Sequence, residues 1–394
     1  MTGASLGPDE REIIATVERF VAREVAPHAA RHERDGTYPD EMIAAMRALG
    51  LFGIAVPEDY GGLGLGVPAL ARVFEALAKG WSTVAAYVNS HSTVAHAIAR
   101  HGTAEQKSLY LPRLAAGDLR GSLCLTEPQG GSDLQAIDTR ADVLASGGYR
   151  LTGDKIYITN GARAGLLLVL AKTDRNPAKP SRGMSLILVE KPQDGVNVGG
   201  SYSKMGFHQV DTVEILLDGA IVSQQALLGD SPGKGFGQLM ESLEIGRIAI
   251  AASAVGVAAS ALAISIRYAA ERKTFGKTIN QHQAIQLRLA EMATRLVAAR
   301  EITLRAAEEK QSGRRADMAS AMAKLYASEA AVDITREAMR VLGGAGYITD
   351  YQVERLHREA LLYLVGEGTN DINKLVIARR LLEGTEASLL DLPP

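Results

Sequence analysis

The first third of the chain carries apolar residues at helical spacing. In the segment DEREIIATVERFVAREVAPHAARHE they recur about one helical turn apart at Ile13, Ile14, Val17, Phe20 and Val21. This spacing predicts an amphipathic helix, which Pro27 interrupts. A second helix is predicted after Pro39 and ends near Gly50. After a Gly- and Pro-rich loop, VPEDYGGLGLGVPAL, the helical pattern resumes over residues 69–77.

From about Asp118 the pattern changes to short β-rich runs. They are GSLCLTE, RADVLA, YRLTGDKIYIT, GLLLVLAKT, GMSLILVEK and TVEILLD, separated by Gly, Asp and Pro. The pair Gly147-Gly148 is expected to join two of them as a hairpin. Because no long helical pattern lies between the runs, we predict an antiparallel β domain and not a doubly wound sheet.

After about Gly233 the pattern is helical again. Long helices are predicted over residues 236–271, 281–311, 317–342 and 353–364, followed by a short last helix. Long helices with short links favour an antiparallel bundle. The predicted fold class is therefore α+β multidomain: an N-terminal α-helical domain over residues 1–118, a central antiparallel β domain over 119–233 and a C-terminal, four-helix-bundle-like α domain over 234–394.

One apolar stretch raises the alternative of a membrane span. Residues 248–266, IAIAASAVGVAASALAISI, carry no charge, and their length approaches that of a spanning helix. They are mostly Ala, Ser and Gly, however, and the helices on either side are amphipathic and charged. We expect a buried central helix packed closely against its neighbours and no membrane span.

Composition narrows the class of protein. The 394 residues are 46% hydrophobic and 22% charged, and Lys+Arg 43 against Asp+Glu 45 gives a net charge of -2. This balance offers no basic field for nucleic acid. The single cysteine, Cys124, excludes an internal disulfide framework and a multi-cysteine zinc site, and no metal site is expected. The first residues lack the basic and apolar regions of a signal peptide, so we expect a cytoplasmic protein.

The stretch VGEGTNDI, residues 365–372, places a carboxylate, Glu367, between Gly366 and Gly368. One interpretation is structural: a helix ends, and Thr369 or Asn370 caps a new one. The other is functional, because a glycine beside a side chain lets a ligand approach closely, and Glu367 could then act as a general base at a helix junction. These residues alone leave both interpretations open.

Four further motifs could hold a cofactor. CLTEPQGGSDL follows a strand with a Gly-rich turn that exposes hydroxyls and backbone N–H groups, and DKIYITNG sets Tyr157 and Thr159 on one face of a strand. ERKTFGKTINQHQ offers an arginine and a glutamine for a phosphate and an amide-bearing ring, and VLGGAGY is a loop that permits close approach. Taken singly, each has an ordinary structural explanation.

In this order, the motifs TEPQGGSD, YITNG, ERKTFGK…HQ, LGGAGY and EGTNDI closely resemble those of the acyl-CoA dehydrogenase family. The resemblance covers nearly the whole chain, and the family's layout is also α, then β, then α. It implies FAD bound between the β domain and the bundle, an acyl-CoA substrate and an electron-transferring flavoprotein as electron acceptor. It also implies a homo-oligomer, usually a dimer of dimers, because some FAD contacts come from a neighbouring subunit.

The resemblance assigns roles residue by residue. Glu367 would be the catalytic base. The FAD contacts implied are Leu125, Thr126, Ser132, Tyr157, Thr159, Arg272, Phe275, Gln283, Arg340, Gly343, Gly344, Thr369 and Asp371, those from 272 to 344 reaching a neighbour's FAD. The substrate-side positions implied are Ser132, Ser181, Glu244, Arg247 and Gly368, with Arg247 near the CoA moiety.

By analogy with the family, Glu367 removes the α-proton of the thioester while the β-hydrogen leaves as hydride to flavin N5, giving a trans-2-enoyl-CoA. Three positions depart from many relatives: Gly366 stands where they have Tyr, Arg340 where they have Gln, and Gly246 where isovaleryl-type members mount their base. Competing functions are an acyl-CoA oxidase or a desulfinase on the same fold, or a catalytically silent FAD-binding scaffold protein.

Overall fold

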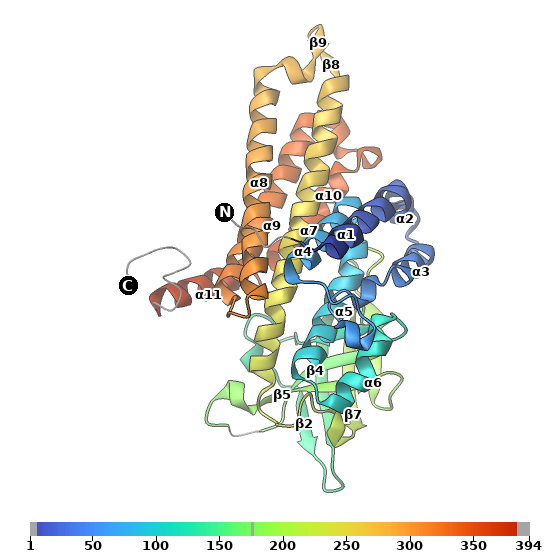
Figure 1. Ribbon diagram of the computed structural model, residues 1–394, viewed down its shortest axis with the longest axis vertical. Helices are drawn as coiled ribbons and strands as arrows, with labels where there is room; N and C mark the ends of the chain where they lie inside the picture. Colours follow the sequence, from blue (N-terminus) through green and yellow to red (C-terminus); the bar gives the residue numbers. More distant parts are fainter. Residues whose placement is uncertain (1–5, 175–176, 384–394) are drawn as a thin grey trace.

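The chain folds as a helical N-terminal part, a central sheet and a long helical bundle (Figure 1). The structure is a computed structural model that describes residues 6–174 and 177–383, so the ends of the first and last predicted domains lie outside the described residues. Its N-terminal elements are α1 (Pro8–Phe20), a π-helical turn (Val21–Val25), α2 (Ala26–Asp35), α3 (Asp40–Ala48), α4 (Val67–Gly80), α5 (Ser82–His101) and α6 (Ala104–Ala115).

The first helical path differs from the prediction at Pro27. The chain does not break there: the π-helical turn leads directly into α2, and Pro27 lies in the first turn of that helix. The π-helical turn accommodates the proline: the Ala26 N–H bonds to the Val21 carbonyl five residues back, and Pro27, which follows, has no N–H to donate.

The central sheet contains β1 (Gly121–Cys124), β2 (Arg140–Val143), β3 (Tyr149–Thr159), β4 (Leu166–Lys172), β5 (Met184–Glu190), β6 (Val196–Ser201) and β7 (Thr212–Val222). The strand order is β1-β4-β2-β3-β7-β6, with β5 also paired to β4. The predicted hairpin is confirmed, since Val143 pairs with Tyr149 across Gly147-Gly148. The sheet is not purely antiparallel: β4 pairs in parallel with β1 and, through one residue pair, with β2. The chain leaves β1, forms the β2–β3 hairpin and returns beside β1 in the same direction, which short-range patterning does not encode.

The C-terminal part contains α7 (Gly235–Glu271), the two-residue strands β8 (Lys273–Thr274) and β9 (Lys277–Thr278), α8 (Gln283–Gln311), α9 (Asp317–Leu342), α10 (Val353–Val365) and α11 (Asn370–Leu382). These bounds agree closely with the predicted helices. The β8–β9 hairpin lies at the end of the bundle that is farthest from the sheet (Figure 1).

Helix α7 is the centre of the bundle. It packs against α4, α5, α8, α9 and α10. Among the described residues it is the one helix long and apolar enough to cross a membrane by length and composition, and 72% of its most apolar window is buried inside the protein. The buried residues include most of the uncharged stretch, so this segment is a core helix of the bundle, as the sequence indicated.

Candidate active site

The Glu367 loop joins two helices at a sharp backbone turn. Helix α10 ends at Val365, and α11 begins after Thr369, whose hydroxyl accepts a hydrogen bond of 3.2 Å from the Ile372 N–H. The capping interpretation is therefore confirmed for Thr369, and it does not exclude the functional one. Between the helices, Glu367 has φ +55° and Gly368 has φ +87°.

The conformational freedom of glycine is needed at Gly368 and not at Gly366, whose φ is -72°. Glu367 itself adopts the left-handed conformation, which costs a residue with a Cβ about 1–2 kcal/mol. Such strain persists only where surrounding contacts impose it, and it is concentrated at functional sites. Tyr157 and Phe275, two predicted FAD contacts, share this conformation with φ of 57° and 52°.

The Glu367 carboxylate is directed into the protein. Its Oε1 accepts a 3.0 Å hydrogen bond from Asn89 Nδ2 on α5. Its Oε2 lies over Gly246 on α7, where a Cβ added to the glycine would be 2.9 Å from that oxygen. The structure therefore brings together Glu367 and the position at which isovaleryl-type relatives were expected to mount their base.

Burial raises the pKa of the Glu367 carboxyl, and the positive charges of Arg247 and Lys324 and the Asn89 hydrogen bond oppose that rise. Removing a carboxylate from water disfavours its charged form and makes it a stronger base once ionised. The loop thus presents a carboxylate whose basicity is higher than that of an exposed glutamate.

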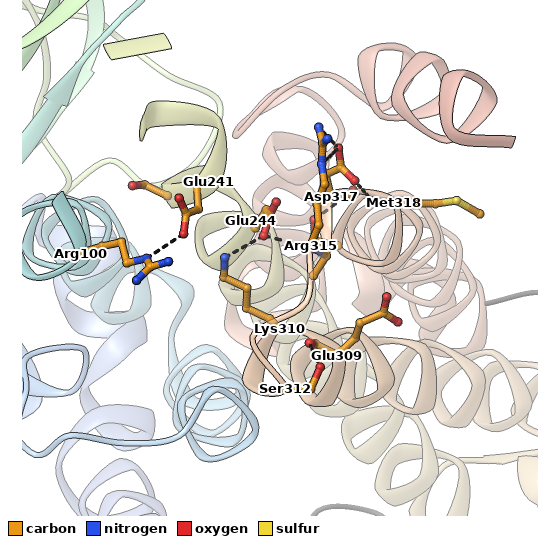
Figure 2. A network of polar contacts seen from close by, with 12 residues as sticks. Arg100, Glu241, Glu244, Glu309, Lys310, Ser312, Arg315, Asp317 and Met318 are labelled. Atoms are coloured by element: carbon orange, nitrogen blue, oxygen red, sulfur yellow. Dashed lines mark hydrogen bonds and ion pairs between the residues drawn. The ribbon is translucent and has the colours of Figure 1, made fainter. Parts of the chain in front are cut away.

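Arg247 and Glu244, both predicted on the substrate side, are buried on α7. Glu244 Oε2 accepts a 2.7 Å hydrogen bond from Lys310 Nζ and a 3.4 Å one from the Ala316 N–H. Figure 2 shows this contact within a polar network that also contains Asp317. The Glu244 carboxylate is therefore already paired inside the chain. Lys310 was not singled out in the sequence, where it is one charge among many on an ordinary helix.

Arg247 is less completely paired. Among the described residues its buried Nε has no hydrogen-bond partner. Burial lowers the pKa of its guanidinium, and the negative charges of Glu367 and Glu244 oppose that shift. A buried guanidinium with an unmatched donor beside the Glu367 carboxylate is available to an anionic or carbonyl group of a ligand.

The predicted flavin contacts of the β domain lie around an ion pair that the sequence did not reveal. Lys155 and Glu127 are buried and 2.6 Å apart, and Lys155 Nζ also donates to the Leu125 carbonyl at 3.0 Å. The pair fixes the backbone on both sides of Thr126. A buried lysine in a strand is hard to recognise in a sequence, because its partner is 28 residues away.

Tyr157 leaves the regular alternation of β3. The register of β3 against β7 shifts between Lys155 and Ile158, and the Tyr157 side chain is 60% exposed with its ring 5.0 Å from that of Tyr202. Thr126 and Thr159 are half-buried, and Ser132 is exposed in the loop before a 3-10 turn (Leu134–Ala136). Hydroxyl groups and an accessible aromatic ring therefore lie along this part of the β domain.

Helix α5 connects this part of the β domain to Glu367. The carbonyl of Ala86 accepts a 3.3 Å hydrogen bond from Asn160 Nδ2 at the end of β3, and the Ser90 hydroxyl accepts one of 3.3 Å from the Leu123 N–H in β1. Asn89, which contacts Glu367, lies between them on the helix. Residues three and four apart share a helix face, so β1, the end of β3 and the Glu367 carboxylate meet at one segment of α5.

The remaining predicted residues are distributed as follows. Ser181 is half-buried in a 3-10 turn (Pro180–Gly183), and Asp371 is exposed in the first turn of α11. The Gly368 carbonyl accepts hydrogen bonds from Lys324 Nζ and Asn373 Nδ2.

A second group of predicted FAD contacts lies far from the Glu367 loop. These residues are in or beside the β8–β9 hairpin, the start of α8 and the end of α9, at the opposite end of the bundle from the sheet (Figure 1). They are Arg272, Phe275, Gln283, Arg340, Gly343 and Gly344. Phe275 is 97% exposed, and a Cβ added to Gly343 or Gly344 would meet nothing within 4 Å. One protomer therefore divides the predicted FAD residues between its two ends.

Each end of the protomer offers groups that suit a part of a flavin dinucleotide. The β-domain end offers hydroxyls, backbone groups held by the Lys155–Glu127 pair and the accessible ring of Tyr157. The bundle end offers a guanidinium, an amide and bare glycine backbone, which suit a diphosphate and its sugars.

Comparison with known proteins identifies the family. The models of the acyl-CoA dehydrogenase N-terminal, middle and C-terminal domains match residues 7–118, 122–220 and 233–382. An acyl-CoA dehydrogenase of Bacillus subtilis (strain 168) is 40% identical over 370 residues, which cover 94% of this chain and 97% of the relative.

Solved structures of the same family superpose closely on this chain. Butyryl-CoA dehydrogenase from Megasphaera elsdenii superposes with a TM-score of 0.93 at 34% identity, covering 97% of this chain and 100% of that one. A chain from a structure described as the electron transferring flavoprotein of Acidaminococcus fermentans gives a TM-score of 0.93 at 36% identity, with the same coverage. Fold and site thus define a three-domain oxidoreductase. The chain belongs to the acyl-CoA dehydrogenase family.

Proposed function

We propose that this chain catalyses the α,β-dehydrogenation of an acyl-CoA thioester to the trans-2-enoyl-CoA, with Glu367 as the base. The observation that carries the proposal is the placement of the carboxylate. It points inward and lies over Gly246, accepts a hydrogen bond from Asn89, and is mounted on a strained turn next to the flavin-side strands.

The raised pKa of Glu367 suits this role. The α-proton of a thioester is weakly acidic, and a general base works best when its own pKa lies near the working pH. Glu367 takes the α-proton on its carboxylate and becomes a neutral acid, a form that its buried surroundings favour. The Glu367 N–H would donate a hydrogen bond to the thioester carbonyl as negative charge develops there.

We infer that FAD binds between the β domain of one copy and the bundle end of another. When bound, FAD would serve as the two-electron oxidant for the hydrogen that leaves the β-carbon. Leu125, Thr126, Ser132, Tyr157 and Thr159 would hold one side of it, and Thr369 and Asp371 would approach it from the catalytic loop. Arg272, Phe275, Gln283, Arg340, Gly343 and Gly344 would reach the FAD of a neighbouring copy. The division of these residues between the two ends of the protomer supports a homo-oligomer, in the family's usual form a dimer of dimers.

On the substrate side, we propose that Arg247 faces the CoA thioester region, together with Ser132, Ser181 and Gly368. Glu244 is proposed to line the same side, and its ion pair with Lys310 holds it in place on α7. An electron-transferring flavoprotein is the proposed electron acceptor, supported by the similarity to the chain from the Acidaminococcus fermentans structure. A cytoplasmic location stays a prediction from the sequence.

The test is an anaerobic flavin-reduction screen. The purified protein, loaded with FAD, is mixed with straight, branched and cyclic acyl-CoAs, and bleaching of the flavin is followed. At least one acyl-CoA should reduce the flavin and yield the enoyl-CoA. Reduced enzyme that reacts faster with oxygen than with an electron-transferring flavoprotein would indicate an oxidase. A flavin that no acyl-CoA bleaches would favour the silent scaffold, and release of sulfite from a sulfinate substrate would favour the desulfinase.

A further inference from the structure

Lys324, on α9, lies behind the catalytic loop and is completely buried. Its ammonium group donates three hydrogen bonds: to the Leu364 carbonyl at 3.2 Å, the Gly368 carbonyl at 2.8 Å and Asn370 Oδ1 at 2.8 Å. An ammonium group has three protons, so each has an acceptor. Two of the acceptors are backbone carbonyls on opposite sides of Glu367.

A second layer of contacts supports this arrangement. Asn370 Nδ2 donates to the Ser328 hydroxyl at 3.0 Å, and Asn373 Nδ2 donates to the Gly368 carbonyl, also at 3.0 Å. Ser328 is on α9, one turn after Lys324. The end of α10, the turn and the start of α11 are therefore all tied to α9 through side chains.

The charge of Lys324 also acts on the Glu367 carboxylate. Glu367 faces Arg247 on α7, Asn89 on α5 and Lys324 on α9. Burial raises the pKa of its carboxyl, and each of these three groups opposes that rise. Lys324 itself faces Glu367, Arg247 and Glu329, and burial lowers the pKa of its ammonium group to about 8. At neutral pH Lys324 is thus mostly protonated, and it favours the ionised form of Glu367.

We propose that Lys324 is a positioning residue for catalysis: its ammonium group ties the backbone on both sides of Glu367, keeps that residue in its left-handed conformation and directs the carboxylate over Gly246. This inference rests on the proposed function of Glu367. A positively charged donor suits the task better than a neutral one, because hydrogen bonds from an ionised donor are about twice as strong as those between neutral groups.

The alternative is that Lys324 only stabilises the fold. The two roles predict different results for Lys324→Met, which keeps the length of the side chain and removes both the charge and the donors. A purely structural role lowers the melting temperature or the FAD content, but leaves the remaining holoenzyme reacting at the wild-type rate. A positioning role changes the reaction of each bound flavin and its dependence on pH.

Stopped-flow flavin reduction, normalised to bound FAD, is therefore measured from acid to neutral pH for wild type and Lys324→Met. We expect flavin reduction in the variant to be at least about tenfold slower. The acid limb of the pH–rate profile, where protonation of Glu367 stops the reaction, should move up by about 1 pH unit. The reason is that an opposite charge near a carboxyl lowers its pKa by about 1–3 units, and the variant lacks that charge. Hydrogen exchange of the peptide spanning residues 364–373 provides a readout independent of activity, and it should be faster in the variant holoenzyme.

Ser328→Ala is the matched control. It removes a hydrogen bond to Asn370 from the same helix without changing charge, and it should leave the acid limb in place. If Lys324→Met does not fold, Lys324→Gln retains two donors without the charge and should show the same shift of the acid limb with a smaller loss of rate.

The proposal would be overturned if either folded variant reduced its flavin at the wild-type rate with an unshifted acid limb. It would also be overturned if both variants lost FAD while the remaining holoenzyme reacted normally. Glu367→Gln distinguishes failure of this proposal from failure of the proposed function. If Glu367→Gln still bleaches its flavin, Glu367 is not the base and the proposed function is wrong. If Glu367→Gln is inert while Lys324→Met reacts normally, only the positioning role of Lys324 is wrong.

Discussion

Moving the base from Glu367 to Gly246 is the perturbation for which the structure makes the most specific prediction. A Cβ on Gly246 would lie 2.9 Å from Glu367 Oε2, closer than side-chain atoms normally approach. A carboxylate mounted on α7 would therefore enter the same space as the natural one, provided that Glu367 is removed. The change is the double variant Glu367→Gly with Gly246→Glu.

The expected magnitudes follow from the geometry. Glu367→Gly alone removes the base and should slow flavin reduction by about 10²–10⁴-fold. It also relieves about 1–2 kcal/mol of backbone strain, because glycine adopts φ of +55° without steric cost. The turn should thus survive the substitution. Adding Gly246→Glu should recover at least about tenfold of the lost rate, equivalent to about 1.4 kcal/mol of transition-state stabilisation.

Anaerobic stopped-flow reduction by the preferred acyl-CoA is the assay. The control is Glu367→Gly with Gly246→Gln, which fills the space without a base and should recover nothing. Gly246→Glu in the presence of Glu367 should be poorly active, because the two carboxyls would be forced together. A double variant that binds FAD and acyl-CoA but is no faster than Glu367→Gly would refute the placement of the carboxylate over Gly246.

Three further predictions concern the same site and its oligomer. Gly246→Ala should slow flavin reduction about tenfold without loss of FAD, since the new methyl group displaces the Glu367 carboxylate; an unchanged rate would contradict the contact. Gly366→Tyr should reduce turnover of branched acyl-CoAs more than of straight ones, by about tenfold or ~1.4 kcal/mol, because the added Cβ meets only Leu362 within 4 Å; equal losses on both substrate classes would argue against a widened pocket. Phe275→Asp should weaken self-association and FAD retention together in sedimentation, and a wild-type monomer holding one FAD per chain would contradict binding between copies.

The sequence predicted the helices and the order of the domains well, because long apolar periodicities set both. The bounds of α9, residues 317–342, agree with the prediction, and α7 was expected to be a buried helix. The parallel pairing of β1 with β4 was not predicted, since nothing local in either strand specifies which neighbour it meets. The passage of the helical path through Pro27 was also missed, because a proline that breaks a helix and one that starts a helix look alike in sequence.

For the site, sequence motifs singled out the Glu367 loop but not the residues that hold it. Glu367 was predicted to be the base from its flanking glycines and from the resemblance to the family. Asn89 contacts Glu367 across 278 positions of sequence. Lys324 contacts Gly368 across 44 positions, and Lys155 contacts Leu125 across 30. Side chains that act over such separations carry no periodicity or spacing of their own, so only the folded chain reveals them.

The central claim is that Glu367 is the base, and Glu367→Gln tests it most directly. The amide keeps the shape of the side chain and a hydrogen bond to Asn89 but cannot accept the α-proton. FAD and acyl-CoA should therefore bind as in wild type, while anaerobic flavin reduction falls by about 10²–10⁴-fold or more. A Glu367→Gln enzyme that bleaches its flavin at close to the wild-type rate would contradict the account.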